Sequence, residues 1–100
     1  MSKIYRALAD PTRRRILELL REREMTAGEI AGHFDLAKPT LSGHFAVLKS
    51  ADLVDVRKAG TSVIYRLNLS VLEEALLSLV QAFRLNEPAP LPLREKETPA

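Results

Sequence analysis

Two short amphipathic segments with a tight break between them, within residues 26–50, constrain the fold of this chain more than any other feature. The second segment begins at Lys38 and carries Leu41, Phe45 and Leu48 at i, i+4 and i+7 spacing. This spacing puts the three apolar side chains on one side of a helix and predicts which side faces the core. Two helices joined by a turn are therefore the centre of the predicted fold.

The first of these helices has a clear start signal. Thr26 and Glu29 have the spacing of a capping box, in which each side chain accepts a hydrogen bond from the other residue's backbone N–H. The helix is expected to end near residues 33–35. Leu36, in the turn that follows, is expected to fill the core.

Two further helices are predicted before this pair. Apolar spacing favours a short helix over residues 3–9, and Asp10 can then cap a second helix that begins at Pro11. The second helix is expected to run to about residue 23. Its buried stripe is formed by Ile16, Leu17, Leu19 and Leu20.

Three consecutive arginines lie at the start of this second helix, and they invite an explanation because cations are mildly unfavourable near a helix N-terminus. One interpretation is a phosphate or an acidic partner. The other is a set of salt bridges to Glu18 and Glu22. The sequence leaves both open for Arg13, Arg14 and Arg15.

A β-hairpin is predicted after the helix pair. Residues 53–57 and 62–67 alternate and are rich in β-branched and aromatic side chains, and the connecting residues 58–61 include Gly60. Arg57 and Lys58 make the tip basic.

A last helix is predicted from Ser70, which has capping-box spacing to Glu73, to about Asn86. Its apolar residues cover more of the helix surface than one small core can bury, so a dimer interface is expected, with a contact to another protein as the alternative. Residues 87–100, rich in proline and charge, are expected to be a disordered tail. The result is one domain over residues 1–86, mainly α with a β-hairpin wing: a winged helix-turn-helix.

Composition excludes several classes of function. The absence of cysteine excludes disulfides and thiolate metal sites, and two histidines with no catalytic motif predict a protein that is not an enzyme. No metal-ligand spacing is present, so neither a metal nor another cofactor is expected. No apolar run approaches the roughly 20 residues of a membrane span, and no secretory signal is found, so a cytoplasmic protein without stable membrane insertion is expected.

The outward side of the second helix of the pair carries small, uncharged side chains and no acidic one. A surface of this kind at a helix start suits a DNA major groove, and the basic wing tip can reach phosphate. Individual residues have alternatives to DNA contact. His44 can simply pack on the flank of its helix, and Ser42 can form a hydrogen bond within its own helix. The wing charges can serve solubility alone. The candidate DNA-contacting residues are Lys38, Pro39, Thr40, Ser42, Gly43, His44, Arg57 and Lys58.

Residues 7–17, 38–45 and the hairpin together resemble the ArsR family of repressors, and most closely its SdpR-type autorepressor branch. The resemblance implies a homodimer on a palindromic double-stranded operator, often that of its own operon, and a membrane protein that sequesters the repressor. It places the dimer interface on the first and last helices. The corresponding residues are Ile4, Leu8, Leu72, Leu76, Leu79 and Phe83.

Three positions depart from the family pattern. Thr26 and Gly28 stand where metal-sensing members carry cysteines, and the last helix has no histidine, so metal sensing is not implied. Gly43 replaces a larger side chain, either for close approach to the groove or through drift. The alternatives to a repressor without metal sensing are a protein-interaction module and a repressor that responds to a metal or ligand at an unrecognised site. The inducer, the operator sequence and the regulated genes are not encoded in any recognisable motif.

Overall fold

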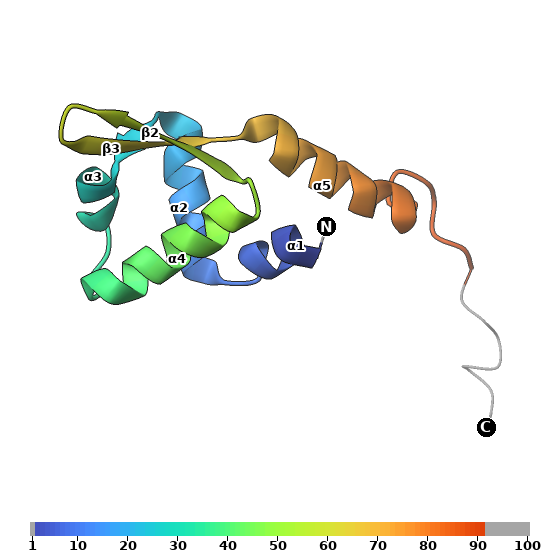
Figure 1. Ribbon diagram of the computed structural model, residues 1–100. Coiled ribbons are helices and arrows are strands. Elements are labelled where there is room, and N and C mark those ends of the chain that lie inside the picture. Colours follow the sequence, from blue (N-terminus) through green and yellow to red (C-terminus); the bar gives the residue numbers. More distant parts are fainter. Residues whose placement is uncertain (1, 92–100) are drawn as a thin grey trace, which may run out of the picture.

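The computed structural model describes residues 2–91 and has the predicted order of helices and hairpin (Figure 1). Four helices are followed by the hairpin and a fifth helix, so the predicted winged helix-turn-helix is confirmed. The elements are α1 (Ser2–Leu8), α2 (Pro11–Glu22), β1 (Met25–Thr26), α3 (Ala27–Ala31), α4 (Lys38–Ser50), β2 (Val54–Ala59), β3 (Ser62–Leu67) and α5 (Leu69–Ala82).

The predicted capping box starts α3. The backbone N–H of Glu29 donates to Thr26 Oγ1 at 3.0 Å, and the backbone N–H of Thr26 donates to Glu29 Oε1 at 2.8 Å. The second hydrogen bond is the main reason why the pKa of Glu29 is lowered from its ordinary value. The prediction that Leu36 fills the core was wrong: Leu36 is 40% exposed, and Phe34 is the residue near this turn that packs against the core.

The apolar stripe of α4 is buried as predicted. Leu41, Phe45 and Leu48 retain 5%, 9% and 0% of their exposure and pack with Ile16, Leu17 and Leu20 of α2. The ring of Phe45 also stacks on Tyr65 of β3, with centroids 4.6 Å apart. Burial raises the pKa of the Tyr65 hydroxyl. This core fixes the rotation of α4 about its own axis.

The sheet has three antiparallel strands in the order β1-β3-β2, not two. Met25 pairs with Tyr65, which joins the start of α3 to the wing, but a two-residue strand is too short to show an alternating pattern. The hairpin strands also extend further than predicted. Ala59 pairs with Ser62, so the turn is only Gly60-Thr61, with Gly60 at φ 65° as a two-residue hairpin turn requires.

The ends of α5 differ from the prediction. Its N-cap residue is Asn68, and Ser70 Oγ donates to Asn68 Oδ1 at 3.1 Å, so the predicted Ser70 capping box does not form. The helix has begun before Ser70, since the N–H of Leu72 already bonds to the carbonyl of Asn68 at 3.3 Å. It ends at Ala82 because Arg84, at φ 51°, terminates it in a Schellman-type turn.

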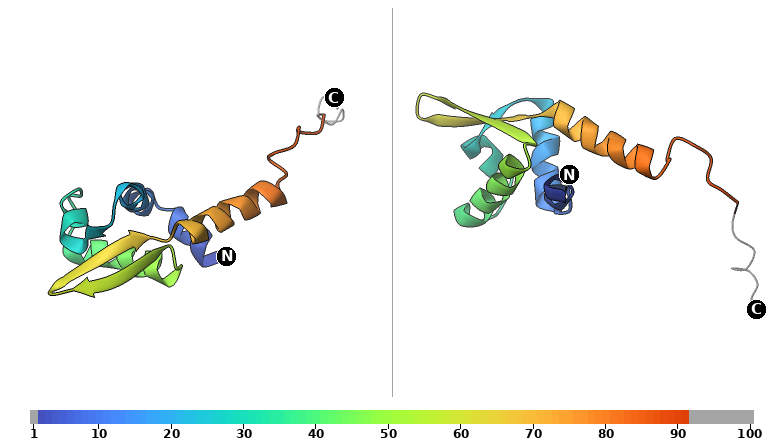
Figure 2. Two further views of the ribbon diagram at one scale, coloured as in Figure 1. Left: turned by 90° about the horizontal axis from the view of Figure 1, so that it is seen from above. Right: turned by 45° about the vertical axis from the view of Figure 1, so that its right-hand side comes forward.

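α5 extends away from the rest of the molecule (Figures 1 and 2). At its start it packs against α1, and beyond its end residues 87–91 form neither helix nor strand. The remainder of the predicted tail, residues 92–100, lies outside the described residues. Among residues 2–91, no helix has both the length and the apolar character needed to cross a bilayer.

Thr26→Ala tests the capping box. The substitution removes the side-chain acceptor of the Glu29 N–H, and the free energy of unfolding is expected to fall by about 1 kcal/mol. Urea denaturation measures this loss. Thr61→Ala, in the exposed wing turn, is the control and is expected to change stability by less than about 0.5 kcal/mol. Equal effects of the two substitutions would contradict the role of the capping box.

Candidate nucleic-acid interface

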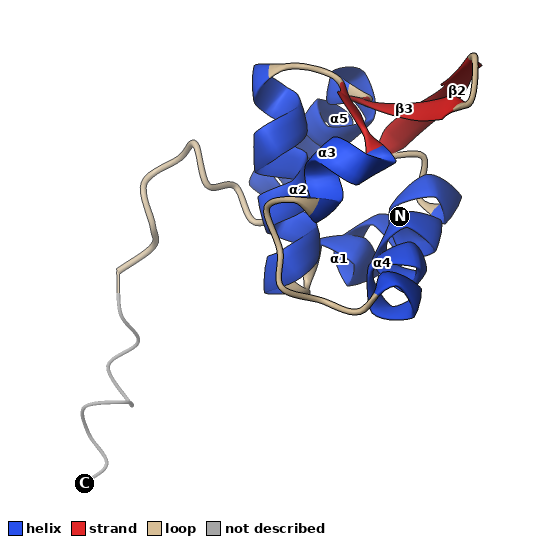
Figure 3. Ribbon diagram, turned by 90° about the vertical axis from the view of Figure 1, so that its left-hand side faces the viewer, coloured by secondary structure: helices blue, strands red, loops and turns tan. Residues whose placement is uncertain are grey.

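The outward side of α4 is a continuous exposed surface without acidic side chains. Pro39, Thr40, Ser42, Gly43 and Ala46 are all exposed, opposite the buried stripe. The wing tip, α3 and the start of α4 lie at one end of the molecule, away from α5 (Figure 1), and Figure 3 views that end directly. This end therefore offers a protruding helix beside a basic hairpin.

The start of α4 is open. Its N-cap residue, Ala37, has no side-chain acceptor, and Pro39 has no N–H. Lys38 is exposed beside them. The free N–H groups and the positive end of the helix dipole can therefore meet an anion such as a phosphate from outside the chain.

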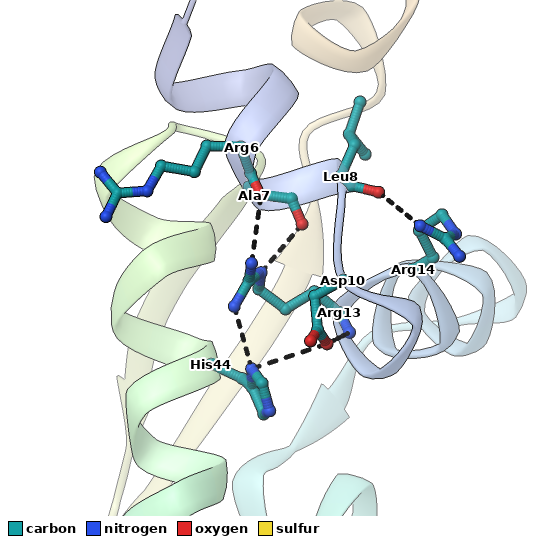
Figure 4. A network of polar contacts seen from close by, with 7 residues as sticks. All are labelled: Arg6, Ala7, Leu8, Asp10, Arg13, Arg14 and His44. Carbon is teal, nitrogen blue, oxygen red and sulfur yellow. Dashed lines mark hydrogen bonds and ion pairs between the residues drawn. The ribbon is translucent and has the colours of Figure 1, made fainter.

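His44 has a different environment from the rest of the candidate set. Only 16% of its side chain is exposed, and its Nδ1 lies 3.1 Å from the NH1 group of Arg13 (Figure 4). The Oδ2 atom of Asp10 is 3.9 Å from the same nitrogen. The ring thus packs on the flank of α4 against the start of α2. Its contact with DNA stays a prediction.

The three arginines at the start of α2 do not share a partner. Arg13 donates to the carbonyls of Arg6 and Ala7, and Arg14 donates to the carbonyl of Leu8 at 2.7 Å (Figure 4). These carbonyls lie at the end of α1. Arginines that start one helix therefore cap the end of the preceding one, where cations are favourable.

Of the three arginines, only Arg15 forms one of the salt bridges that the sequence suggested. Its NH1 group lies 3.0 Å from Glu18 Oε1, and both side chains are mostly exposed, so the pair contributes little to stability. The described residues contain no ion pair between these arginines and Glu22.

Asp10 holds the start of α2 and lies beside His44. Its Oδ2 atom accepts the N–H of Arg13 at 3.1 Å. Partial desolvation acts to raise the pKa of Asp10, but that hydrogen bond and the positive charge of Arg13 lower it from 3.8. Because the folded-state pKa is lowered, the stability that this carboxylate contributes is present above the unfolded pKa and is lost as pH falls through the folded value.

The two candidate cations of the wing differ in their partners. Arg57 forms an ion pair with Glu24, the residue that follows α2, whereas Lys58 is exposed and has no ion-pair partner among residues 2–91. Lys58 can meet a phosphate without losing another contact. Arg57 must first exchange its carboxylate partner for a phosphate.

A second surface is apolar and lies on α1 and α5. Leu76 and Phe83 are 47% and 70% exposed, while Leu72 and Leu79 are half-buried. An open depression of about 450 Å³ lies between the two helices. Its lining residues are Tyr5, Leu8, Ala9, Arg14, Leu72, Leu76 and Leu79. Ile4 is half-buried against the core.

No metal centre is found in the part of the chain that the structure describes: no three His, Asp or Glu side chains come together.

Comparison with known proteins decides the family. The family model "Bacterial regulatory protein, arsR family" matches residues 10–56, from the cap of α2 into the wing. The transcriptional repressor SdpR of Bacillus subtilis is 42% identical over 76 residues, which are 76% of this chain and 84% of that protein. The chain belongs to the ArsR family of bacterial regulatory proteins.

Other members agree with this assignment in sequence and in structure. An arsenical resistance operon repressor of Staphylococcus xylosus is 40% identical, over 73% of this chain and 70% of that protein. The crystal structure of an ArsR family transcriptional regulator superposes with a TM-score of 0.78 at 28% identity, covering 88% of this chain and 97% of the other. As an ArsR-family member with this fold, the chain is a DNA-binding transcriptional repressor.

One polar connection was missed by sequence reasoning. The contacts of Arg13 with the end of α1 and with His44 join residues up to 31 positions apart, and only folding brings them together. A signal was present, since three cations at a helix start directly follow the C-terminal end of another helix. The unsatisfied carbonyls of that end need donors.

Gly43→Ala tests why a glycine lies on the outward side of α4. A Cβ atom there would meet no atom of this chain within 4 Å, so alanine fits. Alanine should raise the free energy of unfolding by about 1 kcal/mol because it favours the helix. If the glycine allows close approach to DNA, operator affinity measured by fluorescence anisotropy should nevertheless fall. Unchanged affinity would favour drift.

Proposed function

We propose that this repressor acts as a homodimer whose two α4 helices enter successive major grooves of a palindromic operator. Half-sites would then lie about one helical turn apart. The candidate contacts on α4 are divided between the open helix start, which approaches phosphate, and the polar side chains, which reach base edges. The wing adds sequence-independent phosphate contacts. Like SdpR-type repressors, it is proposed to control its own operon in the cytoplasm.

One observation carries the proposal: the outward side of α4 is exposed, free of acidic residues and opposite a buried stripe. An ordinary solvated helix side would carry charged residues of both signs. The side chains present are small, so few base contacts are available. Modest sequence discrimination is expected, with much of the affinity coming from the helix end, the wing and the second protomer.

A gel shift with the DNA upstream of its own gene tests operator binding. A shift at low salt that resists competition by unrelated duplex is expected. No shift, together with capture of no duplex from a random library, would favour the alternative of a protein-interaction module.

Replacing both Arg57 and Lys58 with alanine tests the wing. Affinity for all duplexes should fall alike, and the slope of log K against log salt should flatten by about 0.9 for each lost phosphate contact. Arg84→Ala removes a cation beyond the end of α5, away from the wing, and serves as the control. A slope that stays the same in the double variant would remove the wing from the interface.

The proposed dimer interface is the apolar surface of α1 and α5. Leucine and phenylalanine side chains that are about half or more exposed cluster along α5 and its terminating turn, and the depression against α1 continues that surface. A second copy related by a two-fold axis would cover this surface and present two α4 helices. The proposal rests on this exposure and on family membership.

Leu79→Asp tests the interface. A carboxylate in the centre of the apolar surface would be buried without a partner in the dimer, so sedimentation velocity should report a monomer. Leu36→Asp introduces the same charge at an exposed leucine in the helix-turn-helix and should leave the dimer intact. A Leu79→Asp variant that sediments as a dimer would contradict the assignment.

Release from the operator is proposed to occur through a partner rather than a metal. The resemblance to SdpR-type repressors favours a membrane protein that sequesters the repressor, and a metal or small molecule is the alternative. Equilibrium dialysis against zinc, combined with operator release, separates these two routes.

A further inference from the structure

The guanidinium of Arg13 connects the end of α1 to the flank of α4. Its Nε donates to the carbonyl of Ala7 at 2.9 Å, its NH2 donates to the carbonyl of Arg6 at 3.0 Å, and its NH1 lies 3.1 Å from Nδ1 of His44 (Figure 4). All three nitrogens of the group are therefore engaged. Because turning away would break every contact at once, the guanidinium is held in one orientation.

This contact selects one tautomer of His44. An arginine side chain has donors and no acceptor, so Nδ1 of the imidazole must accept the hydrogen bond. In the neutral ring the remaining hydrogen then lies on Nε2. Asp10 does not accept a hydrogen bond from Nδ1, because its Oδ2 atom is 3.9 Å away, beyond hydrogen-bond distance.

The Nε2 atom of His44 is left without a partner in the part of the protein that the structure describes. Within residues 2–91 it has no hydrogen-bond partner, and no buried side-chain nitrogen or oxygen in that part of the chain lacks one. Nε2 is therefore not buried, although most of the ring is. It offers a single N–H donor on the flank of α4.

We propose that Arg13 is a positioning residue for DNA recognition, which holds neutral His44 with its Nε2–H directed at an acceptor atom of the operator. The acceptor is a phosphate oxygen or a purine edge. Arg13 does not contact the operator itself; it orients the His44 ring and is held in place by the carbonyls at the end of α1. This inference rests on the proposed placement of α4 in the groove. It also gives α1, which borders the proposed dimer surface, a direct polar link to a DNA-contacting residue.

Arg13→Gln, measured with a duplex that the wild-type protein selects from a random library, tests the link. Loss of a hydrogen bond to a charged group should weaken binding about tenfold. Arg15→Gln removes the same charge from α2, but the partner of Arg15 is Glu18 and neither α1 nor α4 is involved. It should weaken binding less than about threefold, which is the range of an ordinary exposed charge.

The His44→Ala background separates positioning from direct contact. If Arg13 acts through the ring, Arg13→Gln should change affinity less than about twofold in that background. An equal loss in both backgrounds would show that Arg13 acts elsewhere and would overturn the proposal.

Conservative substitutions of His44 test the donor. Glutamine places an amide N–H near the position of Nε2 and should retain most of the affinity, whereas asparagine offers groups only near Nδ1 and should lose it. Thermal unfolding of each variant checks that the fold is kept. Equal affinities of the two variants would overturn the role of Nε2–H. Library selection with the asparagine variant then identifies the acceptor. Loss of base preference at one position of the selected duplex indicates a purine edge, whereas equal loss of affinity for all duplexes indicates a phosphate.

Nitrogen-15 chemical shifts of the His44 ring give a readout that does not depend on DNA. In the wild-type protein at mildly alkaline pH, Nδ1 should be unprotonated and Nε2 protonated, and Arg13→Gln should shift the ring towards a mixture of tautomers. A proton on Nδ1 of the wild-type ring would contradict the proposal. Failure of the wild-type protein to select any duplex would instead contradict the proposed function, so the two outcomes are distinguishable.

Discussion

Burial of the apolar stripe on α4 is the interaction on which the rest of the structure depends. Leu48 is fully buried, and Phe45 stacks on Tyr65 of the wing. Rotating α4 by even one residue position, about 100°, would expose these side chains. The packing that stabilises the core therefore also determines which side of the helix remains outside. It ties the wing to α4 through the same aromatic pair, so that both parts of the interface are positioned by one cluster.

Polar contacts complete this arrangement where apolar packing ends. Short α1 gains donors for its terminal carbonyls from the arginines that begin α2. One of these, Arg13, also reaches α4. The two proposed functional surfaces, one for the second protomer and one for DNA, are thus linked by a few hydrogen bonds.

Sequence reasoning located the starts of the helices within one or two residues, because the i, i+4, i+7 stripes and the Thr26 capping box act over short distances. It placed the ends of α3 and α5 too late, since these helices end at Ala31 and Ala82. It failed where two local signals competed and where a contact between distant residues decided the structure. Ser70 has capping-box spacing to Glu73, but Asn68 starts α5 first. β1 is a strand only because Met25 pairs with Tyr65, forty residues away along the chain. Leu36 resembles a core residue in the sequence alone, yet Phe34 is the residue near this turn that packs against the core.

The sequence by itself determined the helical periods, the turn at Gly60, the acid-free side of α4 and the apolar excess of α5. Each of these features depends on residues within a few positions of one another in the sequence. Over that range, the geometry of a helix or strand determines the direction of each side chain from its sequence position. Only the tertiary structure decided that Arg57 is held by Glu24, that Arg13 and Arg14 cap α1, and that His44 turns its Nδ1 towards Arg13. Long cationic side chains can reach many acceptors, and which one they meet depends on where folding brings distant backbone segments together.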